Sequence, residues 1–269
     1  MIFKQILFIL NMKYLSPIIF LLVFALHGFS QTPTIESTAY DWEKLDTEGM
    51  DSGEIKTLFE GNSDRFEYLH IFITSLEQGD SFEFPEISYD LERLVIMKSG
   101  SVSQTIGQQN KRLSKGSITL VMPGELLQIQ NSGTEEVTFY VVMWQAKQVI
   151  KSNEGMNSFM IDWEDLAFEE TDKGGRRKVT RKPTVMLDEF EMHVTTLDEG
   201  MRSHPPHTHR DEEIILVRYG EVEELIDGKP YEVGEGSLIF LRSMVPHGIR
   251  NIGKGPCEYY AFRWIPQGQ

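Results

Sequence analysis

Cysteine is nearly absent from this chain of 269 residues, because Cys257 is the only one. A single cysteine excludes a disulfide within the chain. The sequence assigns Cys257 no catalytic partner, so we expect it to be a small, buried, apolar residue. Basic residues are also scarce: 26 Lys and Arg stand against 41 Asp and Glu, giving a formal net charge of −15. So acidic a protein repels nucleic acid and anionic membranes, and we expect it to bind neither.

The first thirty residues contain no acidic residue and carry two lysines, followed by an apolar run at 18–26 and by Gly28 and Ser30. This pattern predicts a secretory signal peptide at 1–30. Translation of the chain starts at Met1 or at Met12, since either start leaves a complete signal peptide. The mature chain then begins at Gln31, has a net charge of −17 and is secreted or periplasmic. An uncleaved membrane anchor is the other interpretation, but the apolar run is shorter than the roughly 20 residues that span a bilayer.

The chain contains two copies of one unit. The sequence Asp-Trp-Glu-Lys-Leu at 41–45 recurs as Asp-Trp-Glu-Asp-Leu at 162–166, an offset of 121 residues. One residue is then lost and the offset becomes 120, at which Gly116 matches Gly236 and Asn131 matches Asn251. This register predicts an N-terminal domain at 31–144, a polar surface connector at 145–161 and a C-terminal domain at 162–269.

Long amphipathic helical periods are missing, and only short helical turns are expected, near Asp41 and Asp162. Short segments rich in β-branched and aromatic residues alternate with Gly, Pro, Asn and Asp, and Asp227-Gly228 is a strong hairpin signal. The predicted strands include 67–76, 91–97, 118–122, 137–144, 189–197, 213–219, 237–241 and 258–264. This pattern predicts an all-β protein with one sandwich or barrel in each repeat.

Histidines gather in the second repeat, where His204, His207 and His209 lie within six residues. If 207–209 is a strand, His207 and His209 project to the same face, because strand side chains alternate. Glu213 then opens the next strand, and His247 returns from a distant one. Three imidazoles and one carboxylate form a ligand set that suits a first-row transition metal. A solvated, His-rich loop is the alternative.

The two segments resemble the paired motifs of the cupin superfamily. His207, His209, Glu213 and Gly220 match its first motif, and His247 with Asn251 matches the end of its second. The usual Pro and Gly before that histidine are replaced by residues 242–244, so this turn must be made differently. The tandem repeat is similar to a two-domain bicupin. The resemblance implies tandem double-stranded β-helix (jelly-roll) barrels, with one divalent transition metal, Mn, Fe, Zn, Ni or Cu, inside the second.

The first repeat lacks these ligands. At the positions of His207, His209, Glu213 and His247 it has Ile87, Tyr89, Arg93 and Leu127. We therefore expect the first barrel to bind no metal and to serve as a structural unit, a pocket wall or a dimer surface.

The repeat comparison also indicates pocket residues, because some positions are polar only in the second copy. Phe72, Phe139 and Met143 become His193, Tyr259 and Arg263. We hypothesise that some of these three line the metal pocket, although they could equally face solvent. A pocket position for Arg263 would favour an anionic substrate, because guanidinium binds carboxylates bidentately. His204 is either a neighbour that orients a ligand or a solvated loop residue.

Three functions remain open from the sequence. The first is a metalloenzyme for a small polar organic substrate, with dioxygenase, aminohydrolase, isomerase or decarboxylase chemistry; bicupins similar to ureidoglycine aminohydrolase and quercetin dioxygenase are the comparisons. The second is a non-catalytic, metal-dependent module that binds a sugar or another small molecule. The third is a structural bicupin with a vestigial site. The basic run at 174–178 is a solvated loop or, as in many cupins, an arm that reaches the neighbour in a homodimer.

Overall fold

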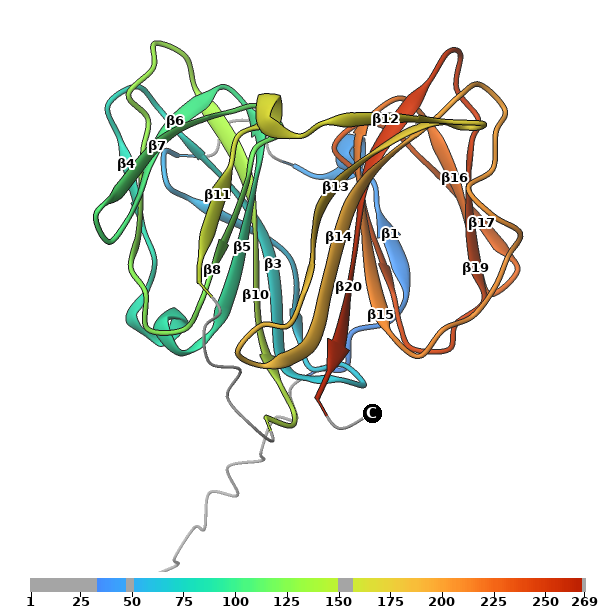
Figure 1. Ribbon diagram of the computed structural model, residues 1–269, viewed down its shortest axis with the longest axis horizontal. Helices are drawn as coiled ribbons and strands as arrows, with labels where there is room; N and C mark the ends of the chain where they lie inside the picture. The colour runs from blue at the N-terminus through green and yellow to red at the C-terminus, as the bar shows by residue number, and fades with distance from the viewer. Residues whose placement is uncertain (1–32, 47–50, 150–156, 268–269) are drawn as a thin grey trace, which may run out of the picture. The chain divides into compact units, whose positions relative to one another are not determined.

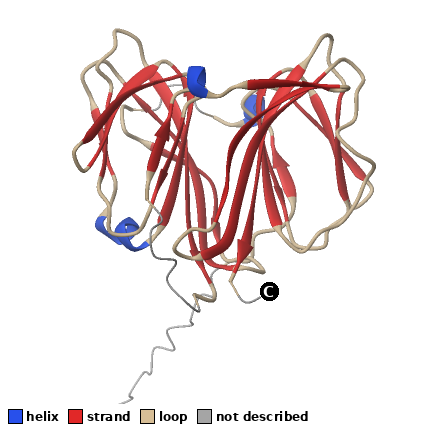
Figure 2. Ribbon diagram, in the orientation of Figure 1, coloured by secondary structure: helices blue, strands red, loops and turns tan. Residues whose placement is uncertain are grey.

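The computed structural model describes residues 33–46, 51–149 and 157–267. The predicted signal peptide lies outside these ranges. Among the described residues, no helix is long and apolar enough to cross a membrane. The secondary structure consists of β-strands and three short 3-10 helices (Figure 2).

The described elements follow one another in the order β1 (Thr38–Tyr40), η1 (Trp42–Lys44), β2 (Ile55–Gly61), β3 (Phe66–Leu76), β4 (Ser81–Glu83), η2 (Glu86–Asp90), β5 (Glu92–Ser99), β6 (Ser101–Ile106), β7 (Gln109–Ser114), β8 (Ile118–Val121), β9 (Leu127–Gln130), β10 (Val137–Ala146), β11 (Phe159–Ile161), η3 (Trp163–Asp165), β12 (Phe168–Thr171), β13 (Gly174–Lys182), β14 (Leu187–Leu197), β15 (Glu212–Tyr219), β16 (Val222–Ile226), β17 (Lys229–Val233), β18 (Leu238–Leu241), β19 (His247–Asn251) and β20 (Cys257–Pro266).

Each repeat forms a barrel from one large and one small antiparallel sheet (Figure 1). In the first barrel the large sheet has the order β11-β8-β5-β10-β3-β2, and the small one β4-β9-β6-β7. In the second barrel the orders are β1-β18-β15-β20-β14-β13-β12 and β17-β16-β19. The predicted all-β class and tandem jelly-roll barrels are thereby confirmed.

Local sequence signals account for these elements. The eight predicted segments correspond to β3, β5, β8, β10, β14, β15, β18 and β20, with ends that differ by a few residues. Asp227 and Gly228, with φ of 47° and 78°, form the predicted hairpin turn between β16 and β17, as a type I′ turn requires. The 3-10 helices η1 and η3 begin where short helical turns were expected, each with an Asp side chain as its N-cap.

Two strands pair with a barrel other than the one suggested by their place in the sequence. β1 precedes the first barrel in sequence but pairs with β18 of the second, with Ala39 opposite Ile239. β11, inside the predicted connector, pairs with β8 of the first barrel, with Met160 opposite Thr119. The basic run at 174–178 also differs from the expected loop, since it belongs to β13. An open sheet edge accepts whichever strand lies beside it, and this pairing is not written in the local sequence.

The buried apolar residues form three clusters. One fills the first barrel and includes Phe72, Phe139 and Met143; a second lies in the other barrel and includes Cys257. The third joins residues of both large sheets, including Trp144 and Trp264. The faces of β10 and β20 that are apolar in both repeats therefore pack the barrels together, while their opposite faces point into the barrels.

Paired polar contacts link the two barrels with pseudo-twofold symmetry. The Tyr140 hydroxyl donates to the Gly236 carbonyl at 2.7 Å, and the Tyr260 hydroxyl to the Gly116 carbonyl at 2.9 Å. Trp42 packs edge-on against Tyr140, as Trp163 does against Tyr260. The tryptophans of the repeated pentapeptide thus pack at equivalent places on the two barrels.

A buried glutamate at the start of an equivalent strand in each barrel holds a loop of the other. Glu92 accepts hydrogen bonds from Trp144 Nε1, Thr184 Oγ1 and Met186 N at 2.8, 2.8 and 2.9 Å. Glu212 accepts from Ser63 Oγ at 2.6 Å and Asp64 N at 3.0 Å. Burial raises the pKa of each glutamate to about 7.

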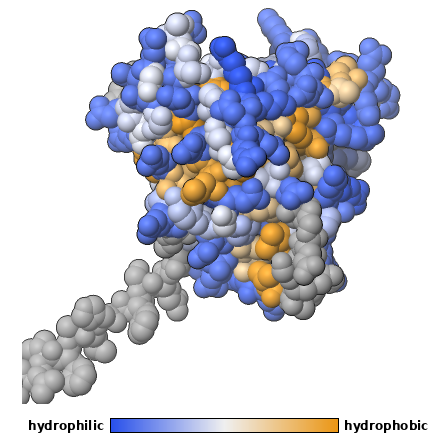
Figure 3. All heavy atoms as spheres, turned by 60° about the vertical axis from the view of Figure 1, so that its left-hand side comes forward, coloured by the Kyte–Doolittle hydropathy of each residue, from blue (hydrophilic) through white to orange (hydrophobic). Residues whose placement is uncertain are grey.

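The surface seen in Figure 3 is mostly hydrophilic, with apolar side chains grouped between charged ones. Exposed large apolar residues among those described include Ile55, Leu126, Val149, Phe168, Met201 and Met244.

Candidate metal centre

His247 begins β19 and faces the interior of the second barrel, where it is 2% exposed. Its Nδ1 lies 2.8 Å from the carbonyl of Val245. A carbonyl can only accept, so Nδ1 carries the proton and Nε2 keeps its lone pair. That Nε2 is buried and has no hydrogen-bond partner among the described residues. It is therefore prepared to donate to a metal ion.

The loop between β14 and β15 carries the other two histidines. His207 and His209 are not in a strand, contrary to the expectation from spacing. The backbones of His207 and His247 instead exchange two hydrogen bonds of 3.0 Å, and the His209 carbonyl accepts one of 2.8 Å from Met244 N. Bonding to the turn before β19 thus aims both imidazoles, with ring centroids 5.3 Å apart, into the barrel.

Glu213 is the second residue of β15, close to its predicted place at the strand start. Its Oε2 lies 3.0 Å from His209 Nε2 and 3.5 Å from His247 Nε2. Burial acts to raise the pKa of Glu213, but the hydrogen bond with His209 and the proximity of both imidazoles outweigh it and hold this pKa below its ordinary value. The hydrogen bond with Glu213 raises the pKa of His209, whereas burial lowers that of His207.

These four side chains converge on one point. Ligand nitrogens of His207, His209 and His247 all lie within 4.8 Å of one another. The Asp211 carbonyl lies 2.9 Å from His209 Nδ1 and accepts its proton in a hydrogen bond, so Nε2 is the nitrogen of that ring that can bind a metal. Three imidazole nitrogens and a carboxylate oxygen, each oriented by the backbone or by each other, fit a divalent first-row transition metal.

A cavity of about 230 Å³ contains this cluster. Its wall includes the four pocket residues considered from sequence: His193, His204, Tyr259 and Arg263. His204 sits edge-on to His207, with ring centroids 4.1 Å apart. Tyr259 is 2% exposed, and burial raises the pKa of its hydroxyl.

Arg263 is already paired with acidic residues of the protein, unlike in the substrate-binding role considered from the sequence. Its Nε donates to Glu191 Oε2 at 2.7 Å, and its Nη1 lies 3.4 Å from Asp211 Oδ2. With two acidic partners, the guanidinium is neutralised within the protein and is not free for a substrate carboxylate. His193, whose Nδ1 is 3.9 Å from Glu191, completes this wall, and burial lowers its pKa.

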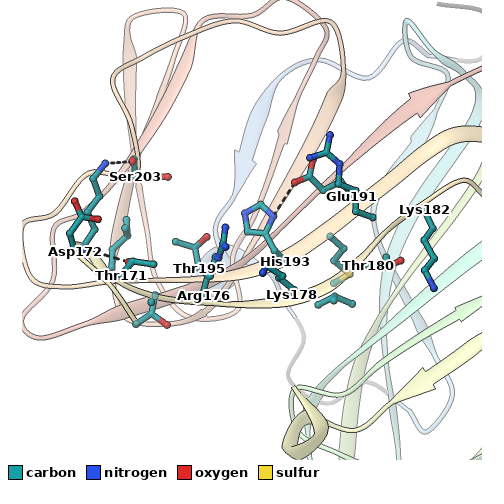
Figure 4. Close-up of a pocket in the computed structure, with 17 residues that line it drawn as sticks. Thr171, Asp172, Arg176, Lys178, Thr180, Lys182, Glu191, His193, Thr195 and Ser203 are labelled. Atoms are coloured by element: carbon teal, nitrogen blue, oxygen red, sulfur yellow. Dashed lines mark hydrogen bonds and ion pairs between the residues drawn. The ribbon is translucent and has the colours of Figure 1, made fainter. Parts of the chain in front are cut away.

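A second, larger cavity of about 620 Å³ adjoins the first and shares Glu191, His193 and Ser203 with it (Figure 4). It lies over β12 to β14, beside the basic residues of β13. Local sequence patterns do not predict this cavity, because its walls come from three strands and the loop after β14.

The metal cavity also has two acidic wall residues that were not predicted from the sequence, Glu191 and Glu224. Glu224 follows Val222 by two residues, so the alternation of β16 places both inside the barrel. The repeat comparison contained a signal as well, since Gln104 occupies the equivalent position in the first barrel.

The turn before His247 is made in an unusual way. Met244 adopts φ of 64°, a left-handed conformation, where the first repeat has Gly124 with φ of 81°. Arg242, just before it, bonds to Glu36 at 2.7 Å and to Asp64 at 2.7 Å. These contacts, together with the bond from Met244 N to His209, replace the expected glycine turn.

The first barrel has a different centre. Arg93 occupies the position of Glu213 and is fully buried. One Nη donates to the Glu125 carbonyl, and the guanidinium lies 5.3 Å from the ring centroid of Phe84 and 5.8 Å from that of Tyr89. A fixed cation among aromatic rings thus stands where the second barrel has an anionic ligand.

Comparison with known proteins agrees with this geometry. Residues 193–263, which contain all four predicted ligands, match the family model of the cupin domain. The second barrel is therefore a cupin domain. No curated protein sequence matches this chain significantly.

Solved structures share its fold at low sequence identity. Protein YlbA from E. coli superimposes with a TM-score of 0.67 at 14% identity, covering 90% of this chain and 96% of its own. Oxalate decarboxylase from Lactobacillus farciminis gives 0.64 at 12%, covering 88% of both chains. Salicylate 1,2-dioxygenase from Pseudoaminobacter salicylatoxidans gives 0.54 at 9%, covering 72% and 70%. At such identities the likeness shows the two-barrel fold.

Proposed function

We propose that this cupin is a metal-dependent enzyme that acts on a small polar organic molecule in the second barrel. One observation carries the proposal: three imidazole nitrogens within 4.8 Å of one another, with a carboxylate oxygen beside them, converge in a cavity of about 230 Å³. His207, His209, Glu213 and His247 would hold one divalent transition ion.

The donor set supports a catalytic site over a closed structural one. An ion held by these four ligands would remain open to substrate or water, and it would act as a Lewis acid on a substrate oxygen. The volume of the cavity limits an enclosed substrate to a small molecule, because a polymer would not fit inside it.

The surrounding residues then orient the substrate. Glu191 and Asp211 fix Arg263 as a rigid, neutralised wall, which leaves the bound molecule to be recognised by hydrogen bonds. The buried hydroxyl of Tyr259 stays protonated at neutral pH and can donate such a bond. Since oxalate decarboxylase and salicylate 1,2-dioxygenase share the fold, decarboxylation and dioxygenation are the two chemistries to examine first.

Metal content tests the proposal. The mature protein is loaded with Mn²⁺, Fe²⁺, Ni²⁺, Cu²⁺ or Zn²⁺ in turn, dialysed and measured by inductively coupled plasma mass spectrometry. We expect one ion per chain, lost in the double variant His207→Ala/Glu213→Ala and retained in the first-barrel control Tyr89→Ala. Absence of retained metal under every condition would refute the site.

Reaction class is then read from the loaded protein. Oxygen uptake with salicylate-like phenols and enols tests dioxygenation, and CO₂ release from oxalate tests decarboxylation. Metal binding with no turnover of any class would instead support the metal-dependent binding module.

We also propose that the protein is exported, on the pattern of residues 1–30. Expression of the full chain in a bacterial host, followed by fractionation and mass spectrometry, should give a periplasmic product that begins at Gln31. A full-length product in the cytoplasm contradicts export.

A further inference from the structure

Glu224 lies on the inner face of the second barrel, next to the candidate metal ligands. In the antiparallel pairing of β16 with β19, Glu224 is opposite Ile249 and Ile226 is opposite His247. Residues that are opposite or two apart share one face of a sheet, so Glu224 and His247 project to the same side. Glu224 is fully buried and forms part of the wall of the metal cavity.

Only one of the two carboxyl oxygens of Glu224 has a partner. Its Oε1 accepts a hydrogen bond of 2.7 Å from Gly248 N. Its Oε2 is buried and has no hydrogen-bond partner among the residues that the structure describes. A buried polar atom without a partner costs about 1–3 kcal/mol, so such an atom in a cavity wall is a place for a ligand to bind.

The first barrel shows how this position is satisfied when no ligand is needed. There Gln104 is equally buried, and its Oε1 accepts a hydrogen bond of 2.7 Å from Thr119 Oγ1. Its Nε2 lies 3.8 Å from the sulfur of Met97. The equivalents of Thr119 and Met97 in the second barrel are Ile239 and Val217, which are apolar and cannot serve as partners.

The second barrel has therefore kept a polar side chain while losing both of its side-chain partners. If this position served only packing, an apolar residue would remove the penalty of the unpaired oxygen. The neighbouring charges also matter. Burial, followed by the negative charge of Glu213, raises the pKa of Glu224 to about 8, against the Gly248 hydrogen bond and the charge of Arg202. A neutral carboxyl group carries a proton that it can donate.

We propose that Glu224 contacts the substrate of this cavity, with its free carboxyl oxygen donating a hydrogen bond to a carbonyl or carboxylate oxygen of the bound molecule. The proposal rests on the proposed function, since it places the substrate beside the metal held by the three histidines and Glu213. The substrate class is accordingly a small acid or carbonyl compound, with one oxygen directed at the metal and another at Glu224.

Binding of oxalate to the Mn²⁺-loaded protein, measured by calorimetry at pH 6, tests this contact. Glu224→Leu removes the donor and should weaken oxalate binding at least tenfold, while Glu224→Gln keeps an N–H donor and should weaken it only a few-fold. The Gln side chain has a precedent for fit in Gln104. The control is Glu223→Gln, the neighbour on the outer face of β16, which pairs with Arg250 and should leave oxalate binding unchanged.

Infrared spectroscopy of the same protein gives a second readout that needs no substrate. The band of neutral carboxyl groups at pH 6 should be weaker by one group in Glu224→Gln than in the wild-type protein, since Glu92 and Glu212 contribute to it in both. Oxalate affinity within twofold of wild type in Glu224→Leu, or an equal band in wild type and Glu224→Gln, overturns the proposal. Failure of the Mn²⁺-loaded wild-type protein to bind oxalate overturns the proposed contact with a small acid. Mn²⁺ content is measured in every variant, so a failure of the metal site is distinguished from a failure of Glu224.

Discussion

The two barrels of this protein share a frame but differ at their centres. Both have a large sheet packed against that of the other barrel and a small sheet on the outside. In the second barrel, three histidines and Glu213 surround a cavity; in the first, Arg93 lies among Phe84 and Tyr89. A buried cation in place of an anionic ligand repels a metal ion. The duplicated fold thus carries a candidate chemical site in the second barrel and a packed interior in the first.

The contacts between the two barrels occur at equivalent positions of both repeats, but the buried glutamate of each repeat accepts a different number of hydrogen bonds. Glu92 accepts three hydrogen bonds, including one from Trp144, whereas Glu212 accepts from Ser63 and Asp64. The indole N–H of Trp264 has no hydrogen-bond partner among the described residues. The loop held by Glu92 should therefore contribute more to stability than its counterpart.

The largest effect is expected from removing that carboxylate. Glu92→Ala removes the acceptor of three buried hydrogen bonds and should lower the free energy of unfolding by about 3–5 kcal/mol. Glu212→Ala removes the acceptor of two and should lower it by about 2–3 kcal/mol. Urea denaturation followed by tryptophan fluorescence measures both. Equal losses would contradict the asymmetry between the barrels.

Next in size is a pH dependence. The folded-state pKa of Glu92, about 7, lies above its ordinary value of 4.5, so the folded chain binds more protons between these two pH values. The free energy of unfolding should therefore fall as pH rises from about 4.5 to 7, with Glu92 contributing up to about 3 kcal/mol. Glu92→Gln should show a flatter profile in denaturation series across this range. An unchanged slope would show that Glu92 is already ionised at low pH.

A smaller effect is expected at the centre of the first barrel. Arg93 Nε and Nη1 are buried and have no hydrogen-bond partners among the described residues, so Arg93→Met should leave stability unchanged or raise it by about 1–2 kcal/mol. Thermal unfolding measures this change, and metal content of the second barrel serves as the control. A loss above 3 kcal/mol would mean that the guanidinium has an essential role.

The smallest effect concerns the turn before His247. Met244→Gly removes a side chain from a left-handed conformation and should stabilise the protein by up to about 1 kcal/mol. Gly124→Ala in the first barrel should destabilise it by about the same amount, since an added Cβ meets no atom within 4 Å and only backbone strain opposes it. Calorimetric melting temperatures of the two variants should shift in opposite directions. A loss of stability in Met244→Gly would show that its side chain forms a needed contact.

The sequence by itself determined the all-β class, the duplication and the four candidate ligands. Strand alternation and turn residues are signals that extend over a few positions of the sequence. The offset of 120 residues aligns equivalent positions of the two repeats, so Glu213 can be compared with Arg93 from the sequence alone. The same offset brought His193, Tyr259 and Arg263 into consideration. Such signals are local or periodic, so they can be read directly from the linear sequence.

Only the tertiary structure decided the partners of these residues. β1 and β11 change barrels because sheet edges pair with whatever strand lies beside them, which local patterns do not encode. Arg263 is neutralised by Glu191 and Asp211, a contact between residues distant in sequence. Glu224 has an unpaired oxygen, and other strands carry apolar residues at the positions where the first barrel has the partners of Gln104. The chemical state of a buried group follows from its neighbours in space, and these are fixed only when the barrel closes.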